Sequence, residues 1–204
     1  MPNIELLEKS MPVAPIRIAA LGCRELAEEV DRKLVKFRNE LVERKQLSVI
    51  PQGYSEESFI VECECPRFGT GEGKGYIKES VRGTDLYIMV DVTNYSESYT
   101  VCGHENHMSP DNHFQDLKRI ISAATGKAHR INVIMPFLYE GRQHRRTKRE
   151  SLDCALALKE LSDMGVSNII TFDAHDPRVQ NSIPLNGFDN FFPTYQFLKA
   201  LIKS

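Results

Sequence analysis

A basic segment between two apolar runs is the part of this 204-residue sequence best suited to chemistry. It follows the apolar run 130–136 and reads Arg142-Gln143-His144-Arg145-Arg146-Thr147-Lys148-Arg149. Arginine forks bind phosphate oxygens bidentately and lysine binds them as a point charge, so these cations could hold a polyphosphate. A charge run alone is more often a solvated loop. Here the segment leaves the end of an expected buried strand, where α/β folds bind ligands, and this position favours a phosphate site.

An acid and an imidazole end the next apolar run, in the order Asp173-Ala174-His175. If the chain is still extended there, Asp173 and His175 point to the same side, because alternate residues share a face. An imidazole can coordinate a cation or bond to metal-bound water, and a nearby carboxylate fixes its tautomer. Magnesium prefers oxygen ligands and keeps several waters, so His175 would be a minor ligand of a nucleotide-bound ion. A capping aspartate beside a surface histidine is the alternative.

Two other groups of residues fit their apparent chemistry poorly. Cys102, His104, His107 and His113 could ligate zinc, but their spacing matches no standard structural zinc pattern, so a metal site there is an unfavoured alternative. The glycine-rich run 69–75 lacks the GxxxxGK[ST] order of a phosphate loop and would connect two strands. We expect that run to be a flexible hairpin tip.

The elements that must position these residues alternate between strands and helices. The final amphipathic segment, 195–202, is expected to pack on the sheet, and the polar stretch 93–112 is expected to be a surface loop or insertion. Alternation of this kind calls for parallel strands with right-handed crossovers, so we predict an α/β fold with helices on both faces of the sheet. Strands are expected at 16–22, 59–65, 75–78, 85–92, 130–136 and 168–173, and helices at 25–38, at 112–125 and around 154–164.

Composition bounds the remaining choices. A chain of 204 residues suits one domain with an insertion, and its formal net charge of −2 provides no global field for nucleic acid. No apolar run is long enough to span a membrane and no secretion signal is visible, which together predict a cytoplasmic protein. Five scattered cysteines then indicate reduced thiols, and none is expected to be catalytic.

Several short motifs occur together in the order found in one enzyme family. The chain resembles the ribose-phosphate pyrophosphokinases (phosphoribosyl diphosphate synthetases) over nearly its whole length from about Ile16. The motifs are Phe68 and Glu72, Glu79-Ser80-Val81-Arg82-Gly83, Asp111-Asn112, Pro136 followed by Tyr139, Arg142-Gln143, Arg149-Glu150, and Asp173-Ala174-His175 with Gln180.

The resemblance implies a fold, a reaction and a set of site residues. The fold would be a phosphoribosyltransferase-like three-layer α/β domain with a small β-hairpin extension. The reaction would transfer the diphosphoryl group of ATP to ribose 5-phosphate, giving 5-phosphoribosyl 1-diphosphate and AMP, with Mg²⁺. Phe68 would flank adenine, Glu72 would contact its edge, and Arg142 and Gln143 would bind the nucleotide. His175 would lie beside the magnesium-ATP phosphates, supported by Asp173, and the protein would be a dimer or hexamer.

The chain also departs from the family pattern. Thr70 stands where relatives usually have Asn or Asp, His144 replaces an Asp, and Ser151 replaces a Pro. The stretch 93–111 is longer than usual, and no second domain with a ribose-phosphate loop and a catalytic loop is seen before Ser204. Residues 1–204 therefore resemble the N-terminal, ATP-binding half of such an enzyme, incomplete as a catalyst. The alternative is a non-catalytic regulatory homologue or nucleotide-binding module that assembles with active subunits.

Overall fold

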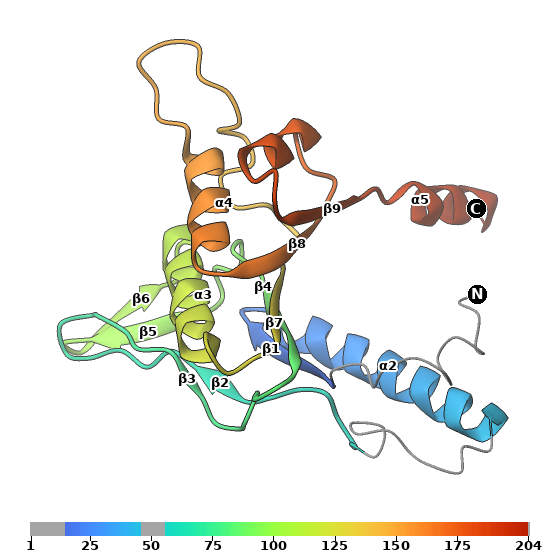
Figure 1. Cartoon of the computed structure of the whole chain (residues 1–204). Helices are drawn as coiled ribbons and strands as arrows, with labels where there is room; N and C mark the ends of the chain where they lie inside the picture. The colour runs from blue at the N-terminus through green and yellow to red at the C-terminus, as the bar shows by residue number, and fades with distance from the viewer. Residues whose placement is uncertain (1–14, 46–55, 204) are drawn as a thin grey trace.

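A five-stranded parallel sheet forms the centre of the molecule. The computed structural model describes residues 15–45 and 56–203, and its strands run in the order β1-β4-β7-β8-β9 (Figure 1). Every neighbouring pair in this sheet is parallel. The main strands are β1 (Ile16–Leu21), β4 (Asp85–Val90), β7 (Arg130–Ile134), β8 (Val166–Phe172) and β9 (Gly187–Phe191).

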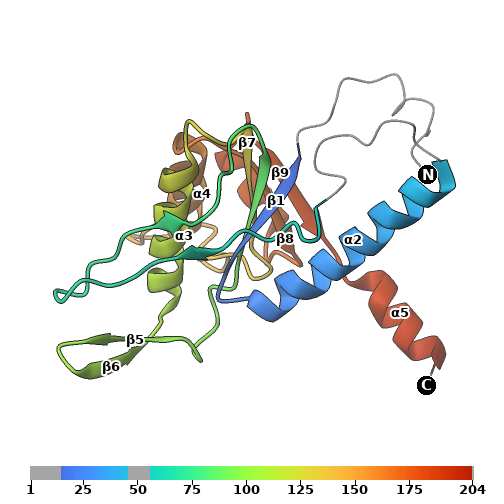
Figure 2. The same cartoon turned by 90° about the horizontal axis from the view of Figure 1, so that it is seen from below.

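Helices cover both faces of this sheet, which confirms the expected α/β class. Helices α3 (Pro110–Ala124) and α4 (Asp153–Asp163) lie on one face, and α2 (Arg24–Lys45) lies on the other (Figure 2). On the first face Ile88 and Val133 pack with α3 and α4 in the main core cluster. On the second face Ile18 and Met89 pack with residues of α2. Strand residues buried on both sides explain why these runs are apolar throughout.

The run 59–65 is extended, but it is not one strand. Ile60 forms an isolated parallel bridge with Ile18 at the free edge of β1, and the chain then leaves to form β2 (Cys63–Glu64). Strand β2 pairs with β3 (Tyr76–Ile77) as a short antiparallel hairpin. The run thus contributes to two sheets, which a single alternating pattern cannot reveal. The hairpin itself was expected, with the glycine-rich run at its tip.

The polar stretch after β4 was expected to be a surface loop or insertion, and part of it has regular structure. It forms a second antiparallel hairpin from β5 (Ser98–Val101) and β6 (His104–His107). Cys102 and Gly103 occupy its two-residue turn with φ of 52° and 80°, as the turn that matches strand twist requires. Strand β6 is exposed along its whole length, so no alternation of apolar and polar residues marks it.

The C-terminal part also differs from expectation. Strand β9 and a 3₁₀ helix, Pro177–Ser182, were not predicted from the sequence. Helix α5 (Thr194–Lys203) was expected to pack on the sheet, but it extends away from it and has no buried residue (Figure 1). Its amphipathic pattern shows that one side of the helix is apolar. The pattern does not show which surface that side packs against. Among the described helices, none is long and apolar enough to cross a membrane.

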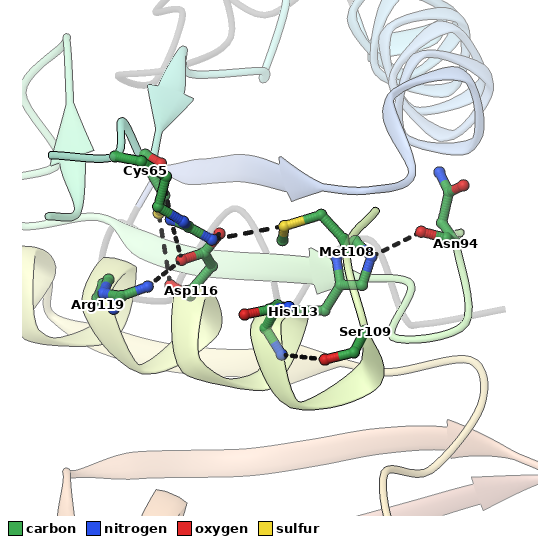
Figure 3. A network of polar contacts seen from close by, with 9 residues as sticks. Cys65, Asn94, Met108, Ser109, His113, Asp116 and Arg119 are labelled. Atoms are coloured by element: carbon green, nitrogen blue, oxygen red, sulfur yellow. Dashed lines mark hydrogen bonds and ion pairs between the residues drawn. The ribbon is translucent and has the colours of Figure 1, made fainter. Parts of the chain in front are cut away.

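A buried cluster of charges attaches the β2–β3 hairpin to α3. Arg67, just after β2, makes a bidentate ion pair with Asp116 of α3, with both N–O distances at 2.8 Å. The two side chains are only 5% and 8% exposed. Arg119 adds a contact of 2.5 Å to Asp116 (Figure 3), and the Arg67 guanidinium lies 4.9 Å from the ring of Tyr99 on β5. A single carboxylate therefore holds both hairpins against the domain.

The glycine that follows the hairpin turn is part of the same attachment. A Cβ atom on Gly75 would lie 2.5 Å from the backbone carbon of Arg119, so only glycine lets β3 approach α3 this closely. A Cβ atom on Gly69, in contrast, would meet nothing within 4 Å. The attachment therefore depends on close backbone contact at Gly75, whereas Gly69 has room for a side chain.

We predict that Asp116→Ala lowers the free energy of unfolding by about 3–5 kcal/mol, because it leaves two arginines next to a buried site without their counter-charge. Urea unfolding followed by circular dichroism measures this. The matched control is Asp163→Ala, which removes an exposed partner of Lys159 and should cost about 0.5 kcal/mol or less. Equal losses in the two variants would contradict the assigned role of Asp116.

Candidate functional site

Two loops meet at the carboxyl ends of β7 and β8. These strands are parallel neighbours, with Val133 opposite Ile169 and Ile134 opposite Ile170, so the loops that follow them start side by side. A small cavity of about 150 Å³ lies between the loops. It is lined by Phe137, Leu138, Gly141, Arg142, Phe172, Asp173, Ala174 and His175. Three of the residues expected from the sequence to bind nucleotide or metal are thus brought together.

The loop after β7 is folded by successive tight turns. The amide of Gly141 donates to the carbonyl of Leu138, and the amide of Gln143 donates to the carbonyl of Glu140. Glu140 has φ of 55°, a left-handed conformation that is uncommon for a residue with a side chain. These turns place Arg142 at the cavity, and the residue is also exposed to solvent.

The side chain of Gln143 does not face the cavity. Its Nε2 atom donates to the carbonyl of Ser151 at 2.7 Å, across the base of the basic loop. The amide of Cys154 in α4 donates to the carbonyl of Gln143 at 3.3 Å. Gln143 therefore joins the two ends of the loop. These contacts give Gln143 a structural role, whether or not it also contacts a ligand.

The loop after β8 leaves the strand earlier than its sequence indicates. The strand ends at Phe172, and Asp173 has φ of 50°, so the argument that alternate residues share a face does not apply to Asp173 and His175. The amide of Asp173 donates to the carbonyl of Phe191, and the amide of Ala174 donates to Oδ1 of Asn190. Strand β9 therefore fixes this loop. Aspartate tolerates the left-handed region better than most residues because its short side chain can bond locally.

His144 connects the two loops, although the sequence assigned it no role. It belongs to the loop after β7 and contacts residues of the loop after β8. Its ring centroid is 5.1 Å from that of His175, with the rings tilted by 60°. Its Nδ1 atom is 3.1 Å from the carbonyl oxygen of Arg142, and its Nε2 atom is 3.6 Å from Oδ2 of Asp176. Hydrogen bonds from Arg178 hold the pKa of Asp176 well below its usual range. The unusual residue at position 144 was the only sequence signal for this contact.

A partly buried tyrosine joins the loop after β7 to helix α3. The hydroxyl of Tyr139 donates to Oδ1 of Asp111 at 2.6 Å, and its ring stacks on Phe114 with centroids 4.3 Å apart. Burial and the bond to Asp111 raise the pKa of Tyr139 above its usual value. Two of the motifs quoted from the sequence, Asp111 and Tyr139, are therefore in contact and hold the start of the loop in place.

Phe68 and Glu72 lie at the tip of the β2–β3 hairpin, away from this cavity. The amide of Phe68 donates to the carbonyl of Glu72, and the Glu72 carboxylate accepts from the hydroxyl of Thr70 at 2.9 Å. The Phe68 side chain is 53% exposed. The hairpin tip and the basic loop lie well apart in Figure 1, so one copy of the chain does not bring these residues to the cavity.

The donor groups at the cavity suit a metal ion that arrives with a nucleotide. Asp173 supplies carboxylate oxygens and His175 an imidazole nitrogen, and neither residue is buried. In residues 15–45 and 56–203, no group of three or more His, Cys, Asp or Glu side chains is arranged to hold a metal by itself. Mg²⁺ commonly takes one or two carboxylates, several waters and substrate phosphates, and this donor set is compatible with that habit.

The cysteine and histidines that were weighed as zinc ligands have separate partners. The thiol of Cys102 points to the carbonyl of Gly69, His107 to the carbonyl of Tyr95, and the buried His113 to the carbonyl of Asn94 (Figure 3). Of the five thiols, Cys102 is the exposed one. Burial raises the pKa of Cys23, Cys63 and Cys154 to about 11 and that of Cys65 to about 12, which keeps these four protonated at neutral pH.

Comparison with known proteins gives a consistent result. A ribose-phosphate pyrophosphokinase of Corynebacterium ammoniagenes is 30% identical over 129 residues, which are 61% of this chain and 36% of that protein. Ribose-phosphate pyrophosphokinase B of Dictyostelium discoideum is 29% identical over 140 residues, 67% of this chain and 38% of that protein. The chain thus matches well under half the length of these relatives.

A solved structure and a family model extend the comparison. The crystal structure of phosphoribosylpyrophosphate synthetase from Mycobacterium smegmatis superposes with a TM-score of 0.61 at 16% identity, covering 92% of this chain and 51% of that one, which shows a shared fold. The family described as the N-terminal domain of ribose phosphate pyrophosphokinase matches residues 18–165. The parallel sheet and the ordered motifs agree with this match: the chain belongs to the ribose phosphate pyrophosphokinase family, through its N-terminal domain.

Proposed function

We propose that this domain binds ATP with magnesium for a ribose-phosphate pyrophosphokinase reaction, in which ATP and ribose 5-phosphate give 5-phosphoribosyl 1-diphosphate and AMP. The observation that carries the proposal is the meeting of Arg142, Asp173 and His175 at one cavity between the loops after β7 and β8. Transfers of phosphoryl type depend mainly on positioning and on neutralising charge, and a guanidinium, a carboxylate and an imidazole in one place suit that task.

The size of the cavity sets how a nucleotide would lie. A volume of about 150 Å³ is below the roughly 300–1,000 Å³ of pockets that enclose small molecules. A phosphate group fits such a space, while the nucleoside would lie across the surface. The exposed cations of the basic loop, Arg145, Arg146, Lys148 and Arg149, provide further positive charge near the phosphates. Magnesium would be held by the phosphates together with Asp173 and His175, and it would reduce their negative charge.

We further propose that the adenine contacts come from a second copy of the chain. Phe68 and Glu72 belong to the motifs of the resemblance, yet in one copy the hairpin tip that carries them lies far from the basic loop (Figure 1). A homo-oligomer in which the hairpin tip of one copy reaches the cavity of another would place all four residues around one nucleotide. Symmetric oligomers form such shared sites readily, since each copy presents both surfaces.

The first test measures nucleotide binding. We expect Arg142→Ala and His175→Ala each to weaken binding of magnesium with a non-hydrolysable ATP analogue about 10- to 100-fold, as the loss of bonds to charged groups predicts. Isothermal titration calorimetry gives the affinities, with Arg32→Ala on α2 and His104→Ala on β6 as matched controls. In the protein that carries the complete catalytic machinery, both variants should also lower AMP release that depends on ribose 5-phosphate. Unchanged affinity in both would refute the site.

The second test asks whether the site is shared between copies. Phe68→Ala and His175→Ala chains should each bind the analogue weakly as pure proteins. After random mixing, about a quarter of the sites would combine an intact hairpin with an intact cavity, so tight binding should reappear at that stoichiometry. Mixing without any recovery, while both pure variants are weakened, would place the hairpin and the cavity of each site in a single copy.

The third test concerns Gln143. The family resemblance implies that it binds the nucleotide, whereas in the structure its side chain bonds across the base of the basic loop. Loss of its bond to Ser151 should lower the free energy of local loop opening by about 1 kcal/mol. The open form of the basic loop should then be populated roughly fivefold more. Trypsin should therefore cleave the loop of Gln143→Ala faster while global stability to urea stays near that of the unmodified chain. Gln196→Ala on α5 is the control. Weaker nucleotide binding with unchanged cleavage would instead identify a direct ligand.

A further inference from the structure

His144 contacts both sides of the candidate nucleotide site. From the basic loop it reaches the carbonyl of Arg142 through Nδ1 at 3.1 Å. Across the gap it reaches Asp176 through Nε2 at 3.6 Å, and its ring lies against that of His175 at 5.1 Å between centroids. Both ring nitrogens thus face oxygen atoms, and rotating the ring about its long axis would break at least one of these contacts.

The far end of this contact is anchored. Asp176 precedes the 3₁₀ helix and its side chain accepts from the amide of Arg178 at that helix's start. The Arg178 guanidinium holds the same carboxylate from the other side, with Nη2 to Oδ2 at 2.6 Å. The buried Val179 fixes the helix to the core. His144 therefore contacts an element that one buried residue fixes to the core, although the loop that carries His144 is largely exposed.

His144 is less exposed than Arg142 and His175, the two residues it would position. The side chains of His144 and Asp176 are 13% and 12% exposed, whereas Arg142 and His175 are open to solvent. A covered residue behind two exposed ones is suited to support them. It leaves their outer sides accessible to a ligand while limiting their movement.

We propose that His144 is a positioning residue that holds Arg142 and His175 at a fixed separation, so that both reach the same phosphate groups. This inference rests on the proposed nucleotide site. His144 acts through the Arg142 backbone on one side and through the His175 ring on the other, with Asp176 as its anchor. Supporting residues of this kind often change affinity about 10- to 100-fold when removed, although they touch no ligand themselves.

Two conservative substitutions separate the two halves of this role. In His144→Asn the side-chain amide occupies the place of Nδ1 and can still donate to the Arg142 carbonyl, but it is too short to reach Asp176. In His144→Gln the amide extends toward Asp176 and loses the bond to Arg142. Each should retain part of the affinity for magnesium with β,γ-methylene ATP, and His144→Ala should lose about tenfold. His104→Ala, an exposed histidine on β6, is the matched control and should bind as the unmodified chain does.

A carboxylate at this position provides a sharper test. His144→Asp would place a second carboxylate near that of Asp176, and like charges repel. Binding should fall further than in His144→Ala. Adding Asp176→Asn, which keeps an oxygen to accept from the Arg178 amide, should recover part of the loss. A double variant weaker than His144→Asp would contradict the contact.

A spectroscopic readout separates positioning from stability. The imidazole ¹H–¹⁵N signals of His175 should shift in His144→Ala without nucleotide, because the neighbouring ring is lost, and they should stay unchanged in His104→Ala. If Arg142→Ala weakens nucleotide binding but no His144 variant changes affinity by more than about twofold, the inference is overturned and the proposed function stands. If the unmodified chain binds no nucleotide, both are overturned.

Discussion

Parallel pairing of β7 with β8 is the constraint on which the site depends. Because Ile134 lies opposite Ile170, both strands end at the same edge and both loops leave from it. Every residue that lines the cavity comes from one of these two loops or the adjoining strand ends. An antiparallel pair would have sent the basic loop and the Asp173-Ala174-His175 segment to opposite edges of the sheet.

A second and separate set of contacts holds the hairpins. The bidentate pair of Arg67 and Asp116 joins them to α3, and α3 in turn holds the loop after β7 through Asp111 and Tyr139. One helix therefore positions both the hairpin residues and the start of the cavity loop. Within one copy of the chain, the placement of the hairpin relative to the cavity loop therefore depends on α3.

Sequence predicted the buried parts of this molecule well, and the polar parts only where motifs helped. Strands such as β4 and β7 are covered on both faces, so their residues had to be apolar and their type was readable. Strand β6 is exposed on both faces and leaves no such pattern. The meeting of Arg142, Asp173 and His175 at one cavity could be expected because all three follow the ends of apolar strands. The contact of His144 with Asp176 joins residues from two loops, and no local rule predicts which polar side chains will meet across a gap.

The exposed thiol at the turn of the β5–β6 hairpin makes the chain selectively labelable. Cys102 is exposed, whereas the other four cysteines are partly or fully buried, so a maleimide dye should attach to Cys102 first. Its sulfur lies 3.5 Å from the carbonyl oxygen of Gly69, in the hairpin tip that also contains Phe68 and Glu72. A fluorophore at Cys102 would therefore report, through its intensity and rotational freedom, when another molecule covers the hairpin tip.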